Sequence, residues 1–434
     1  MITPILIFLF TCILMILAVL FFPTVRVGRL TLDTYPIVTL AGALSLTVCG
    51  KVSFSDIITA FSADTAVNPA KILVLFICMT ILSIYLDELG FFRYLADVTL
   101  HKAGHSQIKL FLYLYLTVSL LTVFTSNDII ILSFTPFICY FAKNARINPI
   151  PYLASEFVAA NTWSMALVIG NPTNIYLSTA YGVGFFDYLK VMLLPTVVAG
   201  ITAFAVLFLM FHKSLSRPIE ADEEKSVIIK DPLCLYIGVG HLAVCTAALA
   251  IGPYIGLEMW LVSLVAVISL SVCVGSVSAL RHKAPTDLGH SVRRAPWQLV
   301  PFMLSMFVLI IGISNAGVSL LIADALEGGG GIFKYGLCSF FSANIINNIP
   351  MSVFFSSVIE NAEVQRGLGD MYATVVGSNI GAFLTPIGAL AGIMWSGILK
   401  GQGIKFGYGD FLKIGATVAV PTLLTALLTL NILL

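Results

Sequence analysis

Ten long apolar runs in this 434-residue sequence are each about the length of a membrane-crossing helix. Such a helix needs roughly 20 predominantly apolar residues. We expect spans at residues 2–22, 34–50, 71–86, 150–180, 189–212, 232–250, 259–280, 299–322, 371–396 and 411–434. Charged residues make up only 10% of the chain, against roughly 25% in soluble domains. The sequence therefore predicts an all-α polytopic protein in the lipid of a plasma (inner) membrane. No basic run indicates nucleic acid binding.

Two further apolar regions, residues 108–142 and 332–359, are interrupted by polar residues at their centres. The first reads T-S-N-D-I-I-I-L-S-F-T-P-F from Thr125, and the second reads S-A-N-I-I-N-N-I-P from Ser342. Each is predicted to be a re-entrant hairpin, because unpaired backbone at membrane depth is tolerated only where protein or a water-filled cavity satisfies it. The alternative for the first region is an extracytoplasmic loop between two ordinary spans, for which its arms are short.

The distribution of positive charge gives an independent test of orientation, because cytoplasmic loops are enriched in Lys and Arg. With both termini outside, 18 of the 23 Lys and Arg residues fall on the cytoplasmic side. The other five are Lys51, Lys71, Lys190, Lys334 and Arg366. In this orientation the first hairpin opens from the cytoplasm and the second opens from the exterior.

Weak internal similarity predicts two inverted repeats of five spans, each with one hairpin. A shift of 218 residues superposes one triplet on another: Asn161, Ile169 and Gly170 on Asn379, Ile387 and Gly388. D-Y-L-K at 187–190 recurs as D-F-L-K at 410–413, and Gly90 corresponds to Gly317. The predicted units are a first repeat at 1–212 with hairpin 108–142 and broken helix 150–180, a cytoplasmic linker at 213–231, and a second repeat at 232–434 with hairpin 332–359 and broken helix 371–396.

Two of the expected spans contain proline within a polar motif. G-N-P-T-N-I covers residues 170–175, and G-S-N-I-G-A-F-L-T-P-I-G-A covers residues 377–389. Because proline removes a helical hydrogen bond and clashes with the preceding turn, Pro172 and Pro386 should break these spans at mid-membrane. Unwound carbonyls and half-helix N-termini then become available to a ligand.

Uncharged amides and hydroxyls dominate these four polar interruptions. Such groups coordinate an ion through oxygen or hydrogen-bond a hydroxylated or anionic solute, and helix N-termini at the same point favour an anion. The candidate solute- and ion-binding residues are Ser126, Asn127, Asp128, Asn171, Thr173, Asn174, Asn347, Asn348, Ser378, Asn379 and Thr385. The candidate hinge residues are Gly170, Pro172, Pro350, Pro386 and Gly388. The scattered cysteines indicate no metal site, and no cofactor is expected.

Asp128 is the acidic residue expected to lie deepest in the membrane. A carboxylate there costs several kcal/mol unless it is paired, hydrated or protonated, so Asp128 is the candidate for coupling to H⁺ or Na⁺. The alternative is a helix-capping role in which it accepts bonds from backbone N–H groups. Asp87, Glu88 and Glu156 are expected to mark the ends of spans near the surface.

At these motifs the chain resembles the ion transporter superfamily, and most closely its branch of arsenite-efflux permeases and NhaD-type sodium/proton antiporters. The resemblance runs from about residue 30 to the C-terminus. It implies two inverted repeats whose hairpin tips meet at a central solute site and that work by alternating access. The related divalent anion/sodium symporters carry Ser-Asn-Thr at both tips. Here Asp128 replaces Thr after Ser126-Asn127, and the second tip reads Asn-Asn-Ile, which favours the arsenite/NhaD-like branch.

Function is therefore expected to be secondary transport of a small inorganic or organic ion, without ATPase motifs or other enzyme activity. The first hypothesis is a proton-coupled permease for a small anion or a metalloid hydroxide such as arsenite. The alternatives are a sodium/proton antiporter and a sodium-coupled di- or tricarboxylate symporter. A non-transporting scaffold or receptor is a further class. A homodimer, and a separate ATPase subunit in the case of an arsenite pump, are compatible partners.

Overall fold

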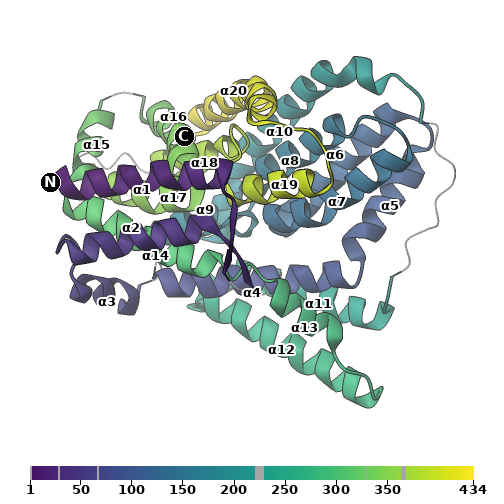
Figure 1. Cartoon of the computed structure of the whole chain (residues 1–434), viewed down its shortest axis with the longest axis horizontal. Helices are drawn as coiled ribbons and strands as arrows, with labels where there is room; N and C mark the ends of the chain where they lie inside the picture. Colours follow the sequence, from purple (N-terminus) through teal and green to yellow (C-terminus); the bar gives the residue numbers. More distant parts are fainter. Residues whose placement is uncertain (1, 28–29, 66–67, 220–228, 329, 363–367) are drawn as a thin grey trace.

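The computed structural model describes residues 2–27, 30–65, 68–219, 229–328, 330–362 and 368–434, most of which are helical (Figure 1). Eight helices in this part of the chain are long and apolar enough to cross a membrane. The helical, polytopic membrane fold predicted from hydropathy is confirmed. The count of ten spans and the inverted relation of the repeats stay predictions. Residues 220–228 of the expected linker lie outside the described residues.

The first half of the chain contains a short strand pair among its helices. β1 and β2 pair in antiparallel fashion, with Val25 opposite Leu32, a hairpin that the sequence pattern did not predict. The elements are α1 (Ile2–Phe21), β1 (Thr24–Val27), β2 (Leu30–Asp33), α2 (Thr34–Val48), α3 (Phe54–Ser62), α4 (Pro69–Glu88), α5 (Phe91–Ala103), α6 (Gln107–Phe124), α7 (Asn127–Asn144), α8 (Ile150–Trp163), η1 (Ser164–Ala166), η2 (Val168–Gly170), α9 (Pro172–Ala180) and α10 (Phe185–Leu215).

The second half repeats this order of long, short and broken helices. Its elements are α11 (Pro232–Ile251), η3 (Gly252–Ile255), α12 (Met259–Leu280), α13 (Thr286–Arg294), α14 (Leu299–Asn315), α15 (Val318–Leu326), α16 (Gly331–Ile346), α17 (Asn348–Glu360), α18 (Gly369–Gly381), α19 (Leu390–Gly401) and α20 (Tyr408–Leu433). The expected span at 299–322 is wrong at its end, because α14 stops at Asn315 and the chain turns.

A glycine in the left-handed conformation makes that turn, and another left-handed glycine makes the corresponding turn in the first half. Gly317 has φ of 79° between α14 and α15, and Gly90 has φ of 88° between α4 and α5. Glycine adopts positive φ without the steric cost that a Cβ brings. The correspondence of Gly90 with Gly317 in the sequence therefore coincides with a shared backbone turn.

Both polar interruptions lie at turns between consecutive helices, as the hairpin prediction requires. α6 ends at Phe124 and α7 begins at Asn127, while α16 ends at Ile346 and α17 begins at Asn348. α6 packs against α8, and α16 packs against α18. α6 is itself long and apolar enough to cross a membrane, so helix length does not establish that the hairpins are re-entrant.

The two proline-containing spans are broken as predicted. Two short 3₁₀ turns separate α8 from α9, and an irregular segment from 382 to 389 separates α18 from α19. Pro172 is the first residue of α9, a position where its missing N–H costs no helical hydrogen bond. Pro386 lies inside the irregular segment.

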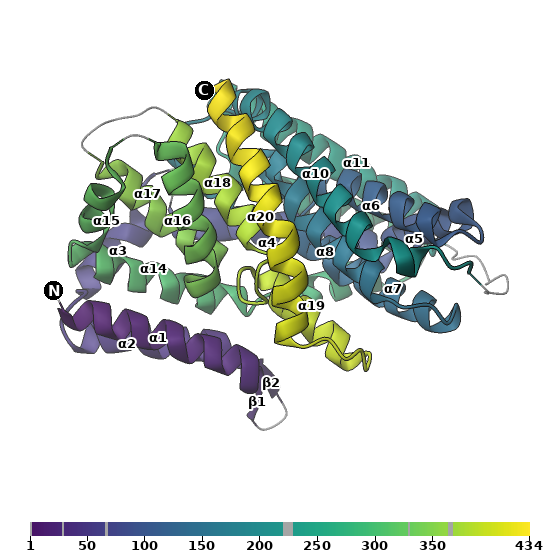
Figure 2. The same ribbon diagram turned by 90° about the horizontal axis from the view of Figure 1, so that it is seen from above.

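The two halves interlock through these broken helices. In Figures 1 and 2, α15 to α17 of the second half lie toward one end of the molecule and α5 to α7 of the first half toward the other, with α10 and α20 between them. α9 packs against α17 and α18, whereas α19 packs against α7. α10 and α20 also pack against each other. Each half therefore inserts the second part of its broken helix into the other half, which brings the two breaks together.

The outermost helices present apolar side chains to their surroundings. α4 is buried over most of its length, whereas α12 has few buried residues. Large exposed side chains on α12 and α1, such as Leu261, Val272 and Phe10, are apolar. Exposed apolar side chains of this kind suit contact with membrane lipid.

Candidate solute site at the two helix breaks

Four buried polar side chains form a cluster, here called the amide hub: Ser164, Asn171, Asn174 and Asn379. Asn379 on α18 is at its centre. The Asn379 Oδ1 accepts hydrogen bonds from Asn171 Nδ2 (3.0 Å) and Ser164 Oγ (2.9 Å). The Asn379 Nδ2 donates to Asn174 Oδ1 (2.8 Å). The hub therefore bonds the second broken helix directly to the break of the first.

The hub residues of the first half also satisfy the backbone groups that the break leaves without helical partners. Asn174 Nδ2 donates to the carbonyl oxygens of Ser164 (2.8 Å) and Leu167 (3.0 Å). Asn171 caps α9, its Oδ1 accepting from the N–H and the hydroxyl of Thr173 (both 3.2 Å). Buried backbone groups need such partners. The structure thus brings the predicted residues Asn171, Thr173, Asn174 and Asn379 together.

The tip of the first hairpin is tied to α8. Asn127 Nδ2 donates to Asn161 Oδ1 (3.0 Å), and Ser126 Oγ bonds to Asn127 Oδ1 (3.4 Å). Asn161 Nδ2 donates to the carbonyl oxygen of Phe157, one turn earlier, as Asn379 Nδ2 does to that of Val375. Asn161 was not among the predicted site residues. Its alignment with Asn379 in the repeat comparison was the signal that could have found it.

Asp128 lies in the first turn of α7, directly after this tip. The residue is 8% exposed, and its carboxyl makes no hydrogen bond or ion pair recorded among the described residues. The capping alternative therefore does not hold. The carboxyl is thus available to a proton or a cation.

The tip of the second hairpin has an unusual backbone. Asn347 has φ of 72° and ψ of 152°, a region that is almost exclusive to glycine and costs about 1–3 kcal/mol. Its Nδ2 donates to the carbonyl oxygen of Ile387 (3.1 Å), and the N–H of Asn348 donates to that of Gly388 (3.1 Å). These bonds hold the strained tip against the second break. Pro350 follows in the first turn of α17.

Two of the predicted hinge residues are glycines because backbone passes close to them. A Cβ on Gly170 would clash with the carbonyl oxygen of Ser164, and a Cβ on Gly388 would lie 2.6 Å from that of Gly381. Both glycines therefore allow the chain after a break to pack on the carbonyls before it. This close approach is the same in the two halves.

The remaining predicted residues, Ser378 and Thr385, border the second break. Thr385 Oγ1 donates to Asn344 Oδ1 (2.7 Å), and Asn344 Nδ2 donates to the carbonyl oxygen of Gly381 (3.0 Å). Ser378 Oγ is buried without a hydrogen-bond partner among the described residues, and so is Asn348 Oδ1. An unpaired buried polar atom costs about 1–3 kcal/mol. A solute with hydroxyl or anionic oxygen groups would satisfy such atoms.

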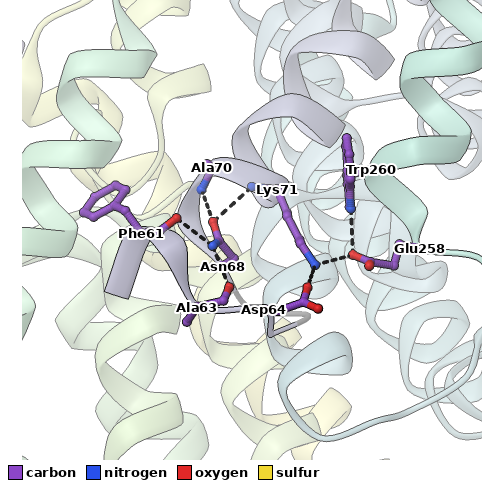
Figure 3. A network of polar contacts seen from close by, with 8 residues as sticks. All are labelled: Phe61, Ala63, Asp64, Asn68, Ala70, Lys71, Glu258 and Trp260. Atoms are coloured by element: carbon purple, nitrogen blue, oxygen red, sulfur yellow. Dashed lines mark hydrogen bonds and ion pairs between the residues drawn. The ribbon is translucent and has the colours of Figure 1, made fainter. Parts of the chain in front are cut away.

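A second polar region, which the sequence analysis did not predict, lies at the N-terminal end of α4. Figure 3 shows Lys71 between two carboxylates, with Nζ 2.7 Å from Asp64 Oδ1 and 2.6 Å from Glu258 Oε2. Trp260 Nε1 donates to the same Glu258 oxygen (2.6 Å). The bond from Lys71 lowers the pKa of both Asp64 and Glu258 below their ordinary values. Asn68 caps α4 beside them, its Oδ1 accepting from the N–H groups of Ala70 and Lys71.

Two pockets of about 340 Å³ each lie against α9. One is lined by Lys71 and Glu258 together with Ser178 of α9. The other is lined by Tyr176 of α9 together with residues of α14 and α17, including Glu360. α9 carries the hub residue Asn174. The helix that carries a hub residue therefore also contributes to the walls of two pockets.

The acidic residues expected near the surface are placed differently. Glu156 on α8 is 0% exposed, so its assignment to a span end near the surface is wrong. Asp87 is also buried, and its carboxylate pairs with Arg294 of α13 (3.0 Å). Glu88 pairs with the same arginine at the end of α4. An acidic residue in a short helix that is buried on all sides gives no periodic signal of its burial.

Comparison with known proteins shows similarity to membrane transporters. Residues 30–372 match the family described as citrate transporter. The chain is 27% identical over 372 residues to the arsenical pump membrane protein of Escherichia coli strain K12, covering 82% of this chain and 84% of that protein. It is 26% identical over 421 residues to a putative arsenical pump membrane protein of Bacillus subtilis strain 168, covering 90% and 92%.

One solved structure has the same fold. The crystal structure of the Alcanivorax borkumensis YdaH transporter matches with a TM-score of 0.58 and 16% identity, covering 99% of this chain and 98% of that chain. The resemblance to arsenite-efflux permeases, which rested on the tip and break motifs, is confirmed by these relatives.

Proposed function

This chain belongs to the citrate transporter family, and from that premise we propose that it is a proton-coupled permease for a small anion or a metalloid hydroxide of the arsenite type. It is an integral, multi-pass membrane transporter. Transport by alternating access would expose the region of the two breaks to each side of the membrane in turn.

The observation that carries the proposal is the uncharged character of the hub. Asn379, Asn171, Asn174 and Ser164 bond to one another through amide and hydroxyl groups, without a lysine, arginine or carboxylate. A metalloid hydroxide is neutral and carries several O–H groups, so amide oxygens and nitrogens can replace its hydration. A tricarboxylate would bring several charges, for which the hub offers no cation. This contrast favours the arsenite-type solute over citrate.

Helix N-termini at the breaks and tips supply partial positive charge for an anionic form of the solute. α7 and α19 start at the first tip and the second break, and neither has a side-chain cap bond at its N-cap, Ser126 or Ala389. Unpaired N–H groups at a helix N-terminus attract an anion. A small anion is thus accommodated without a fixed cation.

Asp128 is the proposed coupling group at the first tip. Its carboxyl has no partner among the described residues and is nearly buried, so binding a proton or a cation would remove an unfavourable charge. We expect Asp128→Asn to remove transport driven by a pH gradient while the protein still folds and inserts. Unchanged proton-driven flux in Asp128→Asn would rule out this role.

The function is tested with purified protein in liposomes under an imposed pH gradient. Arsenite, citrate and sodium are supplied separately, and internal arsenic, citrate or sodium is measured. We expect arsenite to accumulate with the gradient, and the accumulation to collapse when the gradient is dissipated. Sodium moved by the pH gradient would support the sodium/proton antiporter instead, and citrate uptake that requires sodium would support the carboxylate symporter. Flux of none of the three would contradict a transporter for these solutes.

The orientation with both termini outside belongs to the same proposal.

Single cysteines at positions 126 and 347, in a variant without the native cysteines, should be labelled slowly by a membrane-impermeant thiol reagent from either side. Rapid and complete labelling of both, as on loops exposed at the bilayer faces, would refute the placement of the two hairpin tips inside the membrane.

ATP would drive export only through a separate ATPase subunit, and a homodimer is a compatible assembly.

A further inference from the structure

Glu156 is a buried carboxyl that the proposed function does not use. It lies on α8 between Ser155 and Phe157 and is 0% exposed. Thr135 of α7 donates its hydroxyl to both carboxyl oxygens, at 2.8 Å to Oε1 and 3.1 Å to Oε2. A carboxyl without access to solvent, held by neutral donors and without a cation beside it, is an expensive group at membrane depth. Ionisable residues at such positions in membrane proteins usually have a function.

The surroundings of Glu156 come from both halves of the chain. α7 packs against α8 and against α19 (Figure 1). The indole N–H of Trp395 on α19 faces the carboxyl and has no hydrogen-bond partner among the described residues. The Trp395 ring packs on the neighbouring Phe157 with centroids 5.0 Å apart. Ser155 Oγ is likewise buried and unpartnered. The carboxyl thus sits where elements of the two halves meet.

No cation balances this carboxyl in the described part of the chain. None of the ion pairs recorded there includes Glu156, so no lysine, arginine or histidine of α6, α7, α10, α18 or α19 pairs with it. The titratable group that faces it from α7 is the Cys139 thiol. Tyr152, one turn earlier on α8, donates its hydroxyl to Gln107 of α6 instead. Binding a proton is the way left to neutralise Glu156.

Two helices, α7 and α8, connect the surroundings of Glu156 with the tip of the first hairpin. Asn161, which binds the first hairpin tip, is five residues further along α8, about 7–8 Å along the helix axis. Thr135 is seven residues after Asp128 on α7, so the two side chains lie about 10 Å apart along the axis on one helix face. Glu156 is therefore separated from the Asp128 region by about two turns of α7, on the side where α7 ends and α8 begins.

We propose that Glu156 is a second proton-binding group of the transporter, placed between the hairpin tip and the membrane face at which α8 begins. The inference rests on the proposed proton coupling. In one conformation the carboxylate takes up a proton at one oxygen, and Thr135 keeps its bond to the carboxyl. When the broken helices and hairpins move against the outer helices, the proton leaves the carboxyl to the opposite side, and the carboxylate is restored. No other reactant is required.

The test compares two transport modes of the full-length protein in liposomes. Counterflow exchanges labelled arsenite for internal arsenite at equal pH on both sides, and it needs no proton movement. Accumulation driven by a pH gradient needs the coupling proton. We expect Glu156→Gln to keep counterflow and to lose gradient-driven accumulation. Glu156→Asp, which keeps the titratable carboxyl, should retain both modes with a displaced pH midpoint. Asp187→Asn, at an exposed surface pair with Lys190, is the matched control and should behave as the unmodified protein.

Each outcome decides the matter. Gradient-driven accumulation by Glu156→Gln with the original pH dependence would overturn the proposal. Loss of counterflow in both Glu156 variants would assign the residue a structural role and would also overturn it. If the unmodified protein exchanges arsenite but never responds to a pH gradient, or moves no arsenite at all, the proposed function fails first, and that failure is visible before any Glu156 variant is examined.

Discussion

Asn379→Leu removes one side chain that hydrogen-bonds the two halves to each other, while leucine keeps the branching of asparagine at Cγ. Asn171 Nδ2 has its recorded hydrogen bond only with Asn379, so it loses its partner. Ser164 Oγ keeps its bond to the carbonyl oxygen of Asn161 (2.8 Å), and Asn174 Oδ1 keeps the Thr173 hydroxyl (3.3 Å). One newly unpaired buried donor costs about 1–3 kcal/mol. We therefore expect a loss of unfolding free energy of this size and a parallel loss of transport.

Stability alone does not show that the bond between halves matters, so the assay is a double-mutant cycle. Thermal denaturation in detergent is measured for Asn379→Leu, Asn171→Leu and the double variant. The two side chains share a hydrogen bond, for which a coupling of about 0.5–3 kcal/mol is expected. A second cycle pairs Asn379→Leu with Arg281→Met, whose side chain pairs with Asp231 after the end of α12 and shares no partner with Asn379. Its effects should add to within about 0.5 kcal/mol.

The reasoning is refuted by the opposite pattern. If the Asn379 and Asn171 substitutions add without coupling, the 3.0 Å bond between them contributes nothing to the contact between the halves. If Asn379→Leu transports as well as the unmodified protein, the amide hub is not part of the solute site. Either result would remove the basis for placing the solute at the meeting of the two breaks.

Two other predictions concern the hinge glycine Gly170 and the polar region at the N-terminal end of α4. Gly170→Ala should destabilise the protein by about 1–3 kcal/mol, because the new methyl group meets a backbone carbonyl that cannot move aside. The control is Gly275→Ala in α12, where a Cβ meets open space. It should be neutral or stabilising by up to about 1 kcal/mol. Equal denaturation temperatures for the two variants would contradict this. Lys71→Met should raise the pKa of Glu258 toward its ordinary value, because Lys71 lowers it. In the unmodified protein the Lys71–Glu258 interaction is present at neutral pH and is lost as pH falls through the lowered pKa of Glu258. The midpoint of the acid-induced change in Trp260 fluorescence should therefore lie at a higher pH in Lys71→Met. An unchanged midpoint would show that the Lys71 ammonium does not act on the Glu258 carboxylate.

Hydropathy and proline placement were sufficient to predict the two polar turns and the two breaks. The polar tips interrupt apolar arms, and Pro172 cannot continue a helix from α8, so the local sequence alone dictates both features. The left-handed turn at Gly317 was missed, because a helix end inside a long apolar run changes no hydropathy average. Steric freedom at one glycine decides that turn.

Which asparagines bond to one another could not be predicted in the same way. The repeat comparison aligned Asn161 with Asn379, yet Asn161 binds the tip of its own half and Asn379 binds the break of the other half. That difference arises from the exchange of α9 and α19 between the halves, a long-range packing choice. The burial of Glu156 has the same origin, since α19 of the second half covers it. Periodicity reports only what lies within one helix.

The hub and the exchanged helices also bear on how alternating access would proceed. If the two halves rocked against each other as rigid bodies, the bonds of Asn379 would break in every cycle, and α10 and α20, which pack together, would separate. We infer instead that the broken helices and hairpins move as one unit against the outer helices. Thr202 Oγ1 and Thr425 Oγ1 lie 3.2 Å apart on α10 and α20, which makes a disulfide between cysteines at these positions feasible. In a variant otherwise free of cysteine, that cross-link should leave arsenite counterflow intact. Transport that stops on oxidation and returns on reduction would favour rocking of the halves and refute the single moving unit.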